Sequence, residues 1–296
     1  MSSTPADTPR LQAGVSGRRE EFELARREAA LRGLLEEFPS LIVAYSGGVD
    51  SAYLAYAATG VLGARAVCIT ADSPSYPDRH RRLAIRIAGE FGFHHEIIRT
   101  GELDRADYRA NPANRCYYCK QELYTHLAGI ARERGVAAIA DGSNADDRGD
   151  YRPGRQAARE FGVRSPLDEA GLTKGDIREL SRRAGLPTWD EPASACLSSR
   201  IPYLSEVTDR KLRMIERAED VLRDLGFRIC RVRHHGEDPP TARIELARDD
   251  IPRALEADMS AAIDRELHAI GYGLVTMDLR GYRLGSLNEA LRLRPV

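Results

Sequence analysis

The segment from Leu41 to Ala58, LIVAYSGGVDSAYLAYAA, constrains the fold more than any other part of this sequence. It joins a short apolar run typical of a buried strand to a glycine turn and an alanine-rich helical run. Gly47 and Gly48 let several backbone N–H groups point inward, and Ser46 and Ser51 add hydroxyl groups. With the positive end of the following helix, this turn predicts an anion site, although an ordinary strand-to-helix turn has a similar composition.

Apolar runs alternate with helical patterns over most of the chain. Strands are predicted at 41–46, 64–72, 94–100 and 137–144, and helices at 20–38, 51–61, 78–92, 120–135 and 173–185. This alternation predicts an α/β fold, a parallel sheet with helices on both faces. Ligands of such sheets bind at the carboxyl ends of the strands. The polar clusters that follow strands there are Ser46–Ser51, Asp72–Ser73 and Asp141–Asp147.

The pattern changes after Gly185. A segment with the chain's single tryptophan, three prolines and a cysteine precedes a helix at 209–225. Strands at 228–235 and 242–247, a helix opening near Asp250 and a strand at 273–279 complete an αββαβ unit. We therefore predict a disordered tail (1–20), a nucleotide-binding domain (21–186), an active-site loop or linker (187–205) and a smaller α+β domain for substrate binding or oligomerisation (206–296).

Composition excludes several classes of partner. Among 296 residues, 44 Lys and Arg balance 45 Asp and Glu, so no strong field attracts nucleic acid or an anionic membrane. No apolar run reaches membrane-spanning length, and the N-terminus lacks the apolar core of a secretory signal. The five cysteines, an odd number, argue against a disulfide framework and predict a reducing, cytoplasmic location.

The hexapeptide SGGVDS is not a Walker A loop, because that motif's lysine and spacing are absent. It resembles the PP-loop of the ATP pyrophosphatases, a superfamily that includes NAD synthetase, GMP synthetase and tRNA thiolases, with an adenine nucleotide alpha hydrolase-like fold. The resemblance implies that ATP is cleaved between its α and β phosphates to adenylate a substrate oxygen. The implied ATP-site residues are Ser46, Gly47, Gly48, Val49, Asp50, Ser51, Thr70, Ala71, Asp72, Ser73, Asp141, Gly142, Ser143 and Asn144.

Asp50 raises a question, because its carboxylate should repel a bound anion. A Mg²⁺ ion between Asp50 and pyrophosphate would invert that repulsion. Alternatively, Asp50 caps the first turn of its helix, and both roles are compatible.

Longer motifs carry a more specific resemblance. They are NRCYYCK (Asn114–Lys120), DGSNADDRGDYRPGRQAARE (Asp141–Glu160), EPASACLSSRIPY (Glu191–Tyr203) and DLRGYRLGSLNEAL (Asp278–Leu291). Together they resemble the LarE family, ATP-dependent sulfur transferases that make the nickel-pincer nucleotide cofactor, from about Leu31 onward. The resemblance implies adenylation of pyridinium-3,5-biscarboxylic acid mononucleotide, attack by Cys196, and a thiocarboxylate product. Sacrificial members are left with dehydroalanine. It also suggests a homo-oligomer that works with the carboxylase and nickel-insertion proteins of the same pathway.

Cys116 and Cys119 form a C-x₂-C pair, which binds metal, forms a redox disulfide or occurs by chance. A structural zinc site needs four ligands, and there is no second such pair. Together with Cys196 the pair matches a three-cysteine form, in which a [4Fe–4S] cluster or a persulfide delivers the sulfur and Cys196 is spared. Cys68 and Cys230 lie in predicted strands and are expected to be core residues.

Several charged residues are candidate substrate ligands: Lys120, Arg152, Arg155, Arg200, Arg231 and Arg233. Guanidinium groups suit carboxylate and phosphate, although Arg231 and Arg233 could equally form surface ion pairs on an edge strand. Glu219, Glu245 and Asp250 are candidate ligands of a divalent ion. His234 and His235 point to opposite sides of a strand, so they should not form one chelate.

Three other functions remain open. An amidotransferase or synthetase similar to NAD synthetase would not need Cys196. A tRNA thiolase would need a basic, aromatic-rich surface, which this near-neutral sequence lacks. A nucleotide-binding sensor would not turn ATP over.

Overall fold

The computed structural model describes residues 8–149, 153–192 and 195–283 of the chain. The helices and strands, in chain order, are α1 (Thr8–Glu36), β1 (Leu41–Ala44), α2 (Val49–Leu62), η1 (Gly63–Arg65), β2 (Ala66–Asp72), α3 (Asp78–Glu90), β3 (His94–Arg99), η2 (Glu102–Asp104), α4 (Ala106–Arg109), α5 (Arg115–Arg134), β4 (Ala138–Ala140), η3 (Ala145–Gly149), α6 (Pro153–Glu160), α7 (Pro166–Glu169), α8 (Lys174–Arg183), η4 (Leu197–Arg200), α9 (Asp209–Asp224), β5 (Cys230–His235), β6 (Thr241–Leu246), η5 (Arg248–Asp250), α10 (Ile251–Ala254), α11 (Ala257–Ile270) and β7 (Leu274–Met277).

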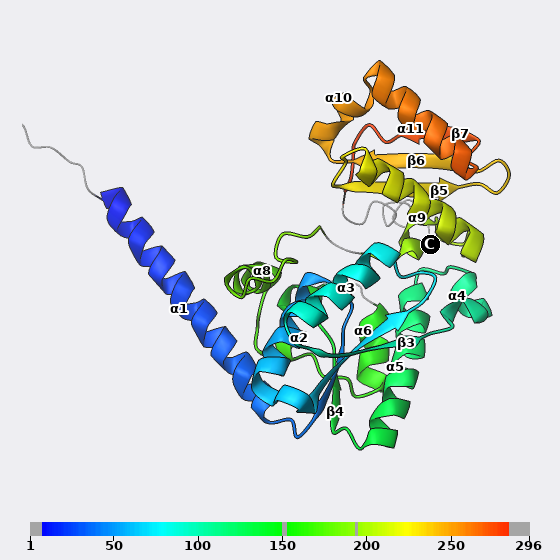
Figure 1. Cartoon of the computed structure of the whole chain (residues 1–296). Coiled ribbons are helices and arrows are strands. Elements are labelled where there is room, and N and C mark those ends of the chain that lie inside the picture. The colour runs from blue at the N-terminus through cyan, green and yellow to red at the C-terminus, as the bar shows by residue number, and fades with distance from the viewer. Residues whose placement is uncertain (1–7, 150–152, 193–194, 284–296) are drawn as a thin grey trace, which may run out of the picture.

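The first sheet has the strand order β3-β2-β1-β4, and every neighbouring pair is parallel. One face is covered by α1, α2, α3 and α8, whose apolar side chains form one core with β1 and β2. The other face is covered by α5 and α6, which pack on the same strands (Figure 1). The α/β fold predicted from the sequence is therefore confirmed. Strand β1 is apolar at every position because both faces of this sheet are covered by helices.

A second, mixed sheet follows α9, with the order β5-β6-β7. β5 and β6 are antiparallel, whereas β6 and β7 are parallel. Helices α9 and α11 share an apolar core with this sheet and lie at the top of Figure 1. The predicted αββαβ order is correct, and Pro252 lies in the first turn of the short helix α10, as expected. Cys68 and Cys230 are fully buried, as predicted.

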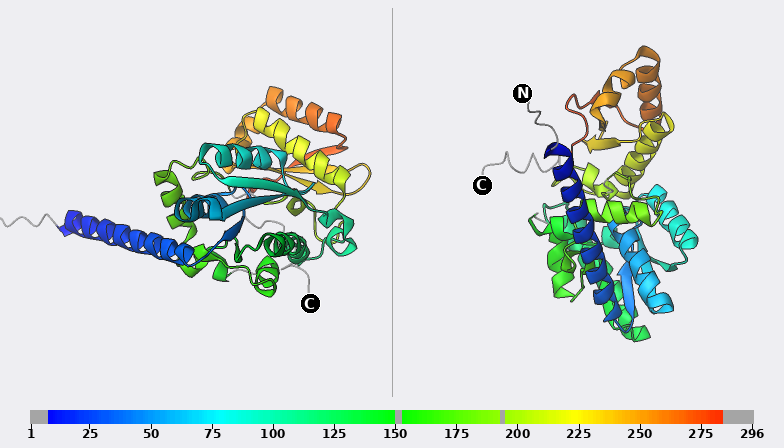
Figure 2. Two further views of the ribbon diagram at one scale, coloured as in Figure 1. Left: turned by 60° about the horizontal axis from the view of Figure 1, so that its bottom comes forward. Right: turned by 90° about the vertical axis from the view of Figure 1, so that its left-hand side faces the viewer.

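Three local predictions differ from the structure. Helix α1 begins at Thr8, so residues 8–20 are helical instead of forming a disordered tail, and α1 extends away from the body of the molecule (Figures 1 and 2). The composition of residues 8–20, which includes Pro9, Gly14 and Gly17, does not itself favour a helix, whereas Leu24, Leu31 and Leu35 further along α1 pack in the core. Helix α5 begins at Arg115, five residues early, and helix α6 was not predicted. Among the described residues, no helix is long and apolar enough to cross a membrane.

Candidate functional site

The PP-loop (Ser46–Ser51) connects the carboxyl end of β1 to the first turn of α2. The backbone N–H of Ser46 donates to Ser51 Oγ over 3.1 Å, and the two hydroxyl oxygens are 3.0 Å apart. Gly47 has φ of 65°, and a Cβ atom there would lie 2.8 Å from the Cβ of Ala84 on α3. The loop therefore needs glycine at this position for both its conformation and its close contact with α3.

Asp50 is held by two side chains from distant parts of the sequence. Lys174 Nζ forms an ion pair with Asp50 Oδ2, and Asn144 Nδ2 donates to Oδ1 over 3.3 Å. Sequence reasoning predicted Mg²⁺ beside Asp50 but missed Lys174, the first residue of α8. Thr173 and Asp176 form the capping box of that helix. A lysine at a helix N-terminus opposes the helix dipole, so its position was a signal that it serves another purpose.

The loop after β4 packs directly on the PP-loop. A Cβ atom on Gly142 would lie 2.9 Å from the backbone N of Ser51. The Asp141 carboxylate accepts hydrogen bonds from Tyr124 (2.9 Å) and from Ser165 (2.8 Å). Asp141 thus holds this loop together from within, and Asn144 from the same loop reaches Asp50 of the PP-loop.

Other predicted ATP-site residues differ in availability. The Thr70 hydroxyl is buried and donates to Tyr45 O over 2.7 Å, so this side-chain group is engaged inside the sheet. A contact between Thr70 and a nucleotide stays a prediction. Ala71 and Asp72 end β2, and Asp72 lies 3.8 Å from the Arg81 guanidinium. The backbone carbonyl of Ser143 accepts the N–H of Asp168, so the backbone of Ser143, and not its hydroxyl, makes this contact.

The segment after β2 joins the PP-loop to the Cys196 segment. Tyr76 donates its hydroxyl to Ser46 O over 2.9 Å. One residue earlier, Ser75 O accepts the backbone N–H of Leu197 over 2.8 Å. The predicted ATP residue Ser73 lies in the same segment, with its hydroxyl 3.0 Å from that of Ser75. The PP-loop and the Cys196 segment are therefore connected through Ser75 and Tyr76.

The three candidate cysteines come from two segments. Cys116 and Cys119 lie at the start of α5, and Cys196 directly precedes η4. Burial raises the pKa of Cys119, and the charges of Glu102 and Cys196 add to the rise. Desolvation also raises the pKa of the Cys116 thiol, followed by the charge of Cys196, whereas Arg115 lowers it. The charge of Cys196 thus acts on the pKa of both other thiols.

A [4Fe–4S] cluster takes cysteine thiolates as ligands, and these three thiols have the required chemistry. In the described parts of the chain, however, no group of three or more His, Cys, Asp or Glu side chains is arranged to hold a metal ion. The oxygen atoms of Asp50, Ser46 and Ser51 are donors of the kind that Mg²⁺ takes beside phosphate.

Arg200 holds the Cys196 segment. Its Nη1 donates to Ala195 O (2.7 Å) and to Cys196 O (3.0 Å), while Nε and Nη2 contact the two carboxylate oxygens of Glu219 at 2.8 and 3.0 Å. Its side chain is 1% exposed. These contacts give Arg200 a role in fixing the backbone around Cys196, and a contact between Arg200 and substrate stays a prediction.

The predicted divalent-ion site is not formed by the described residues. Glu219 is also contacted by Arg223 at 2.7 Å, and although burial raises its pKa, the surrounding arginines hold it at about 2. Glu245 is buried and pairs with Arg233 at 2.7 Å. Asp250 ends η5 and joins neither group. Buried carboxylates that are already paired with guanidinium groups are poor metal ligands, which corrects this prediction.

Arg231 and Arg233 lie where the second sheet faces the Cys196 segment. Arg233 Nη1 donates to Ser199 O over 2.8 Å, and the Arg231 guanidinium lies 5.1 Å from the ring centroid of Tyr282. Burial and, after it, the charges of four nearby arginines together lower the pKa of His80 to about 4. Both arginines are buried, so they are not surface ion pairs, and the region is rich in positive charge.

Arg155 lies on helix α6 and not on a loop, which corrects its predicted placement. Its Nη2 pairs with Asp168 Oδ2 at 2.6 Å, whereas its Nη1 is buried without a hydrogen-bond partner among the described residues. A Cβ atom on Gly154 would lie 3.0 Å from Cγ of Lys120, so α6 packs on α5 beside this lysine. Arg152 lies outside the described residues.

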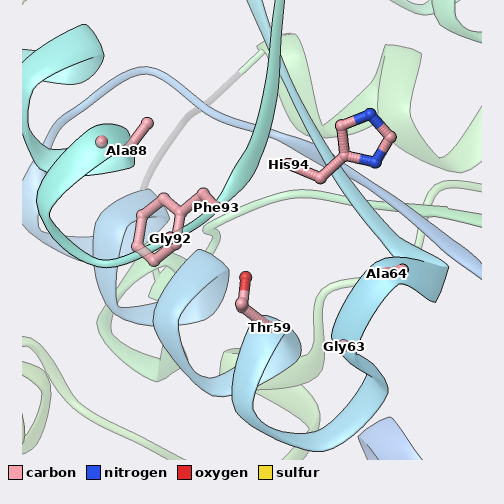
Figure 3. A pocket seen from close by; sticks show the side chains of 8 residues that line it. Thr59, Gly63, Ala64, Ala88, Gly92, Phe93 and His94 are labelled. Carbon is pink, nitrogen blue, oxygen red and sulfur yellow. The ribbon is translucent and has the colours of Figure 1, made fainter.

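The pocket in Figure 3 is not part of this site. Its volume is about 510 Å³, and its lining includes Thr59, Gly63, Gly92, Phe93 and His94. These residues precede β2 and β3 or lie at their amino ends, at the opposite edge of the sheet from the PP-loop. Ligands of parallel sheets bind at the carboxyl edge, so this pocket is not the candidate active site.

A parallel sheet with a glycine-containing PP-loop after β1 defines the fold class of the ATP pyrophosphatases. No family model matches this sequence. The chain is 35% identical over 272 residues to the pyridinium-3,5-bisthiocarboxylic acid mononucleotide synthase of Lactiplantibacillus plantarum. The matched region covers 90% of this chain and 96% of that protein. It is 44% identical over 261 residues (88% and 96%) to an uncharacterized Synechocystis protein. It is also 27% identical over 252 residues (84% and 94%) to an uncharacterized Methanocaldococcus jannaschii protein. The chain therefore belongs to the LarE family of pyridinium-3,5-bisthiocarboxylic acid mononucleotide synthases.

Proposed function

We propose that this enzyme adenylates a carboxylate of pyridinium-3,5-biscarboxylic acid mononucleotide at the PP-loop and transfers sulfur to it at Cys196. The relative's name refers to the bisthiocarboxylic acid product, which supports sulfur transfer to this class of nucleotide. The observation that carries the proposal is the segment after β2. Tyr76 contacts the PP-loop, and the carbonyl of Ser75 accepts the N–H of Leu197, the residue after Cys196. Adenylation and sulfur transfer would therefore take place on either side of the same short segment.

In the first half-reaction, a substrate carboxylate oxygen attacks the α-phosphorus of ATP and pyrophosphate leaves. The PP-loop N–H groups and the positive end of α2 would hold the departing pyrophosphate. Lys174 lies beside Asp50 and would release it to contact a phosphate oxygen. Mg²⁺ bound by Asp50 would supply charge neutralisation between the phosphate groups.

In the second half-reaction, the thiolate of Cys196 attacks the acyl carbon and AMP leaves, which gives a thioester. Loss of the Cys196 α-proton with cleavage of the Cβ–S bond then yields the thiocarboxylate and dehydroalanine. Adenylation makes this attack feasible because AMP is a far better leaving group than oxide. Arg200 fixes the Cys196 carbonyl and so orients the nucleophile.

A second candidate route uses Cys116 and Cys119 together with Cys196, whose charge raises the pKa of both other thiols, although the three side chains are not arranged as a metal site in the described residues. A [4Fe–4S] cluster held by these three residues would supply a sulfur atom that does not come from a protein side chain, and Cys196 would survive turnover. Lys120, Arg155, Arg231 and Arg233 would bind substrate carboxylate and phosphate, because the unpartnered Arg155 Nη1 and the positive region around His80 suit anions.

Mass spectrometry and partial reactions test this function. Wild-type protein should catalyse ATP–pyrophosphate exchange that requires substrate, and Cys196→Ala should keep the exchange but make no thiocarboxylate. Asp50→Ala should stop both. After anaerobic turnover, loss of the mass of H₂S from Cys196 indicates sacrifice, whereas an unchanged chain with repeated turnover indicates the cluster route. Sulfur transfer by Cys196→Ala, or no exchange by wild type, would contradict the proposal.

We also propose a cytoplasmic location, since all five cysteines are free. A homo-oligomer and contacts with the carboxylase and nickel-insertion proteins of the pathway remain proposals that sedimentation and pull-down experiments can test.

A further inference from the structure

Arg115 is a buried guanidinium group to which the mechanism above gives no role. It is the first residue of α5, it precedes Cys116 directly, and it is only 5% exposed. No carboxylate of the described residues forms an ion pair with it. Arg200, by contrast, is buried against the Glu219 carboxylate. A buried cation without a carboxylate is costly unless another anion is near.

Free cysteine thiols lie on both sides of Arg115 along the chain segments that it joins. It directly precedes Cys116, and its Nη1 bonds the carbonyl of Ser198, two residues after Cys196. The guanidinium therefore lies between the C-x₂-C helix and the Cys196 segment.

Arg115 also makes direct contacts that connect these segments. Its Nη1 donates to Ser198 O over 3.0 Å, two residues after Cys196, and also to Asn111 Oδ1. Asn111 is fully buried, and its Nδ2 donates to Pro202 O (2.8 Å) and to Ser205 O (3.1 Å). The segment after Cys196 is thus fastened to the start of α5 through one arginine and one asparagine.

We propose that Arg115 is a positioning residue for sulfur transfer: it fastens the Cys196 segment to the C-x₂-C helix and places a buried, permanently charged guanidinium group beside the sulfur atoms that react. The inference rests on the proposed function but concerns the step after adenylation. The same charge would serve thiolates in the sacrificial route and an anionic cluster in the other route.

The test compares Arg115→Met, which removes the charge, with Arg115→Lys, which keeps it. Arg105→Met is the matched control, because Arg105 also contacts α5, at 5.5 Å from the Tyr118 ring centroid, but pairs with Asp107 and does not bond the Cys196 segment. Arg115→Met should slow single-turnover sulfur transfer about tenfold or more, the loss expected for a buried charge-assisted hydrogen bond. Substrate KM and ATP–pyrophosphate exchange should not change, and Arg115→Lys should recover most of the rate.

A second readout needs no activity. In reduced, metal-free protein, mild oxidation should distribute Cys196 between disulfides with Cys116 or Cys119 and the free thiol. Arg115→Met should lower the fraction of Cys196 in disulfides severalfold relative to the internal Cys116–Cys119 disulfide, as measured by peptide mass spectrometry, while Arg105→Met should leave it unchanged.

Wild-type transfer and disulfide fractions in Arg115→Met would overturn the inference. An Arg115→Lys variant as slow as Arg115→Met would overturn the role of charge, and a raised substrate KM at an unchanged rate would reassign Arg115 as a substrate ligand. Failure of the proposed function looks different, since wild type would then lack exchange or sulfur transfer altogether.

Discussion

At the scale of single residues, the ion pair between Lys174 and Asp50 answers the question raised by an acid in an anion-binding loop. Without a ligand, the lysine neutralises the carboxylate. In the proposed reaction, the same lysine would turn to the phosphates of ATP. The pair would thus keep a cation beside the bond that the proposed adenylation breaks, at a position where the helix dipole would otherwise disfavour it.

Lys174→Ala should therefore weaken ATP use more than folding. We expect KM for ATP in pyrophosphate exchange to rise about tenfold, because one charge-assisted contact to phosphate is lost. Arg182→Ala on the same helix is the control, since Arg182 is exposed and pairs with Glu179. Equal KM values for the two variants would show that Lys174 does not contact the nucleotide.

Glu219 gives a prediction about pH. Its pKa in the folded protein is about 2 against 4.5 for the free side chain, so its contribution to stability is present above about pH 4.5 and is lost as pH falls toward 2. At neutral pH, Glu219→Gln should lower the free energy of unfolding by about 3 kcal/mol, the cost of breaking a buried pair. Urea denaturation should show this difference shrinking toward about pH 3.

Glu179→Gln is the matched control for Glu219. The pKa of Glu179 is also held at about 2 by hydrogen bonds from Arg182 and Arg183, but this side chain is 34% exposed, against 1% for Glu219. Water screens such pairs, so the control should have wild-type stability at each pH. A Glu219→Gln variant that behaves like the control would contradict the idea that its buried pair stabilises the fold.

At the scale of elements, the site depends on how closely the loop after β4 approaches the PP-loop. In Gly142→Ala the added Cβ would clash with the backbone of Ser51, and a clash with backbone cannot be relieved by rotating a side chain. We expect a loss of about 1 to 3 kcal/mol in stability and slower pyrophosphate exchange.

Gly129→Ala is the control for this change. Gly129 lies in α5, and a Cβ atom added there would have no atom from outside its own helix within 4 Å. Alanine should therefore stabilise the helix by about 0.5 to 1 kcal/mol. Chemical denaturation of both variants gives the comparison. Equal stability of the two would mean that the loop moves aside without cost.

The helices and strands also differ in how well the sequence predicts them. Strand β1 and the turn after it were predictable because apolar runs and paired glycines are local signals. The first turn of α5, from Arg115, was missed because Cys and Tyr have low helix propensity, whereas packing against α6 favours a helix there. Arg200 shows the limit for side chains: its motif marked it as important, but its bond to Glu219 joins residues that only the fold brings together.

At the scale of the whole molecule, helices from the two sheets meet directly. The backbone N–H of Asp78, at the start of α3, donates to Glu216 Oε1 on α9 over 2.6 Å. Glu216 therefore acts as a helix cap supplied by the second part of the chain. Sequence patterns within either part could not predict this contact, because the local pattern of each helix gives no information about which distant residue caps it.

Glu216→Ala should loosen this junction without unfolding either part. Loss of a helix cap costs about 1 kcal/mol, so amide hydrogen exchange in the first turn of α3 should accelerate several-fold. Sulfur transfer should slow, since Ser75, three residues before α3, holds the Cys196 segment, while ATP–pyrophosphate exchange should be largely kept. Glu266→Ala, which removes an exposed partner of Arg265 on α11, is the control. If exchange at α3 and sulfur transfer both match this control, the junction does not couple the second sheet to the active site.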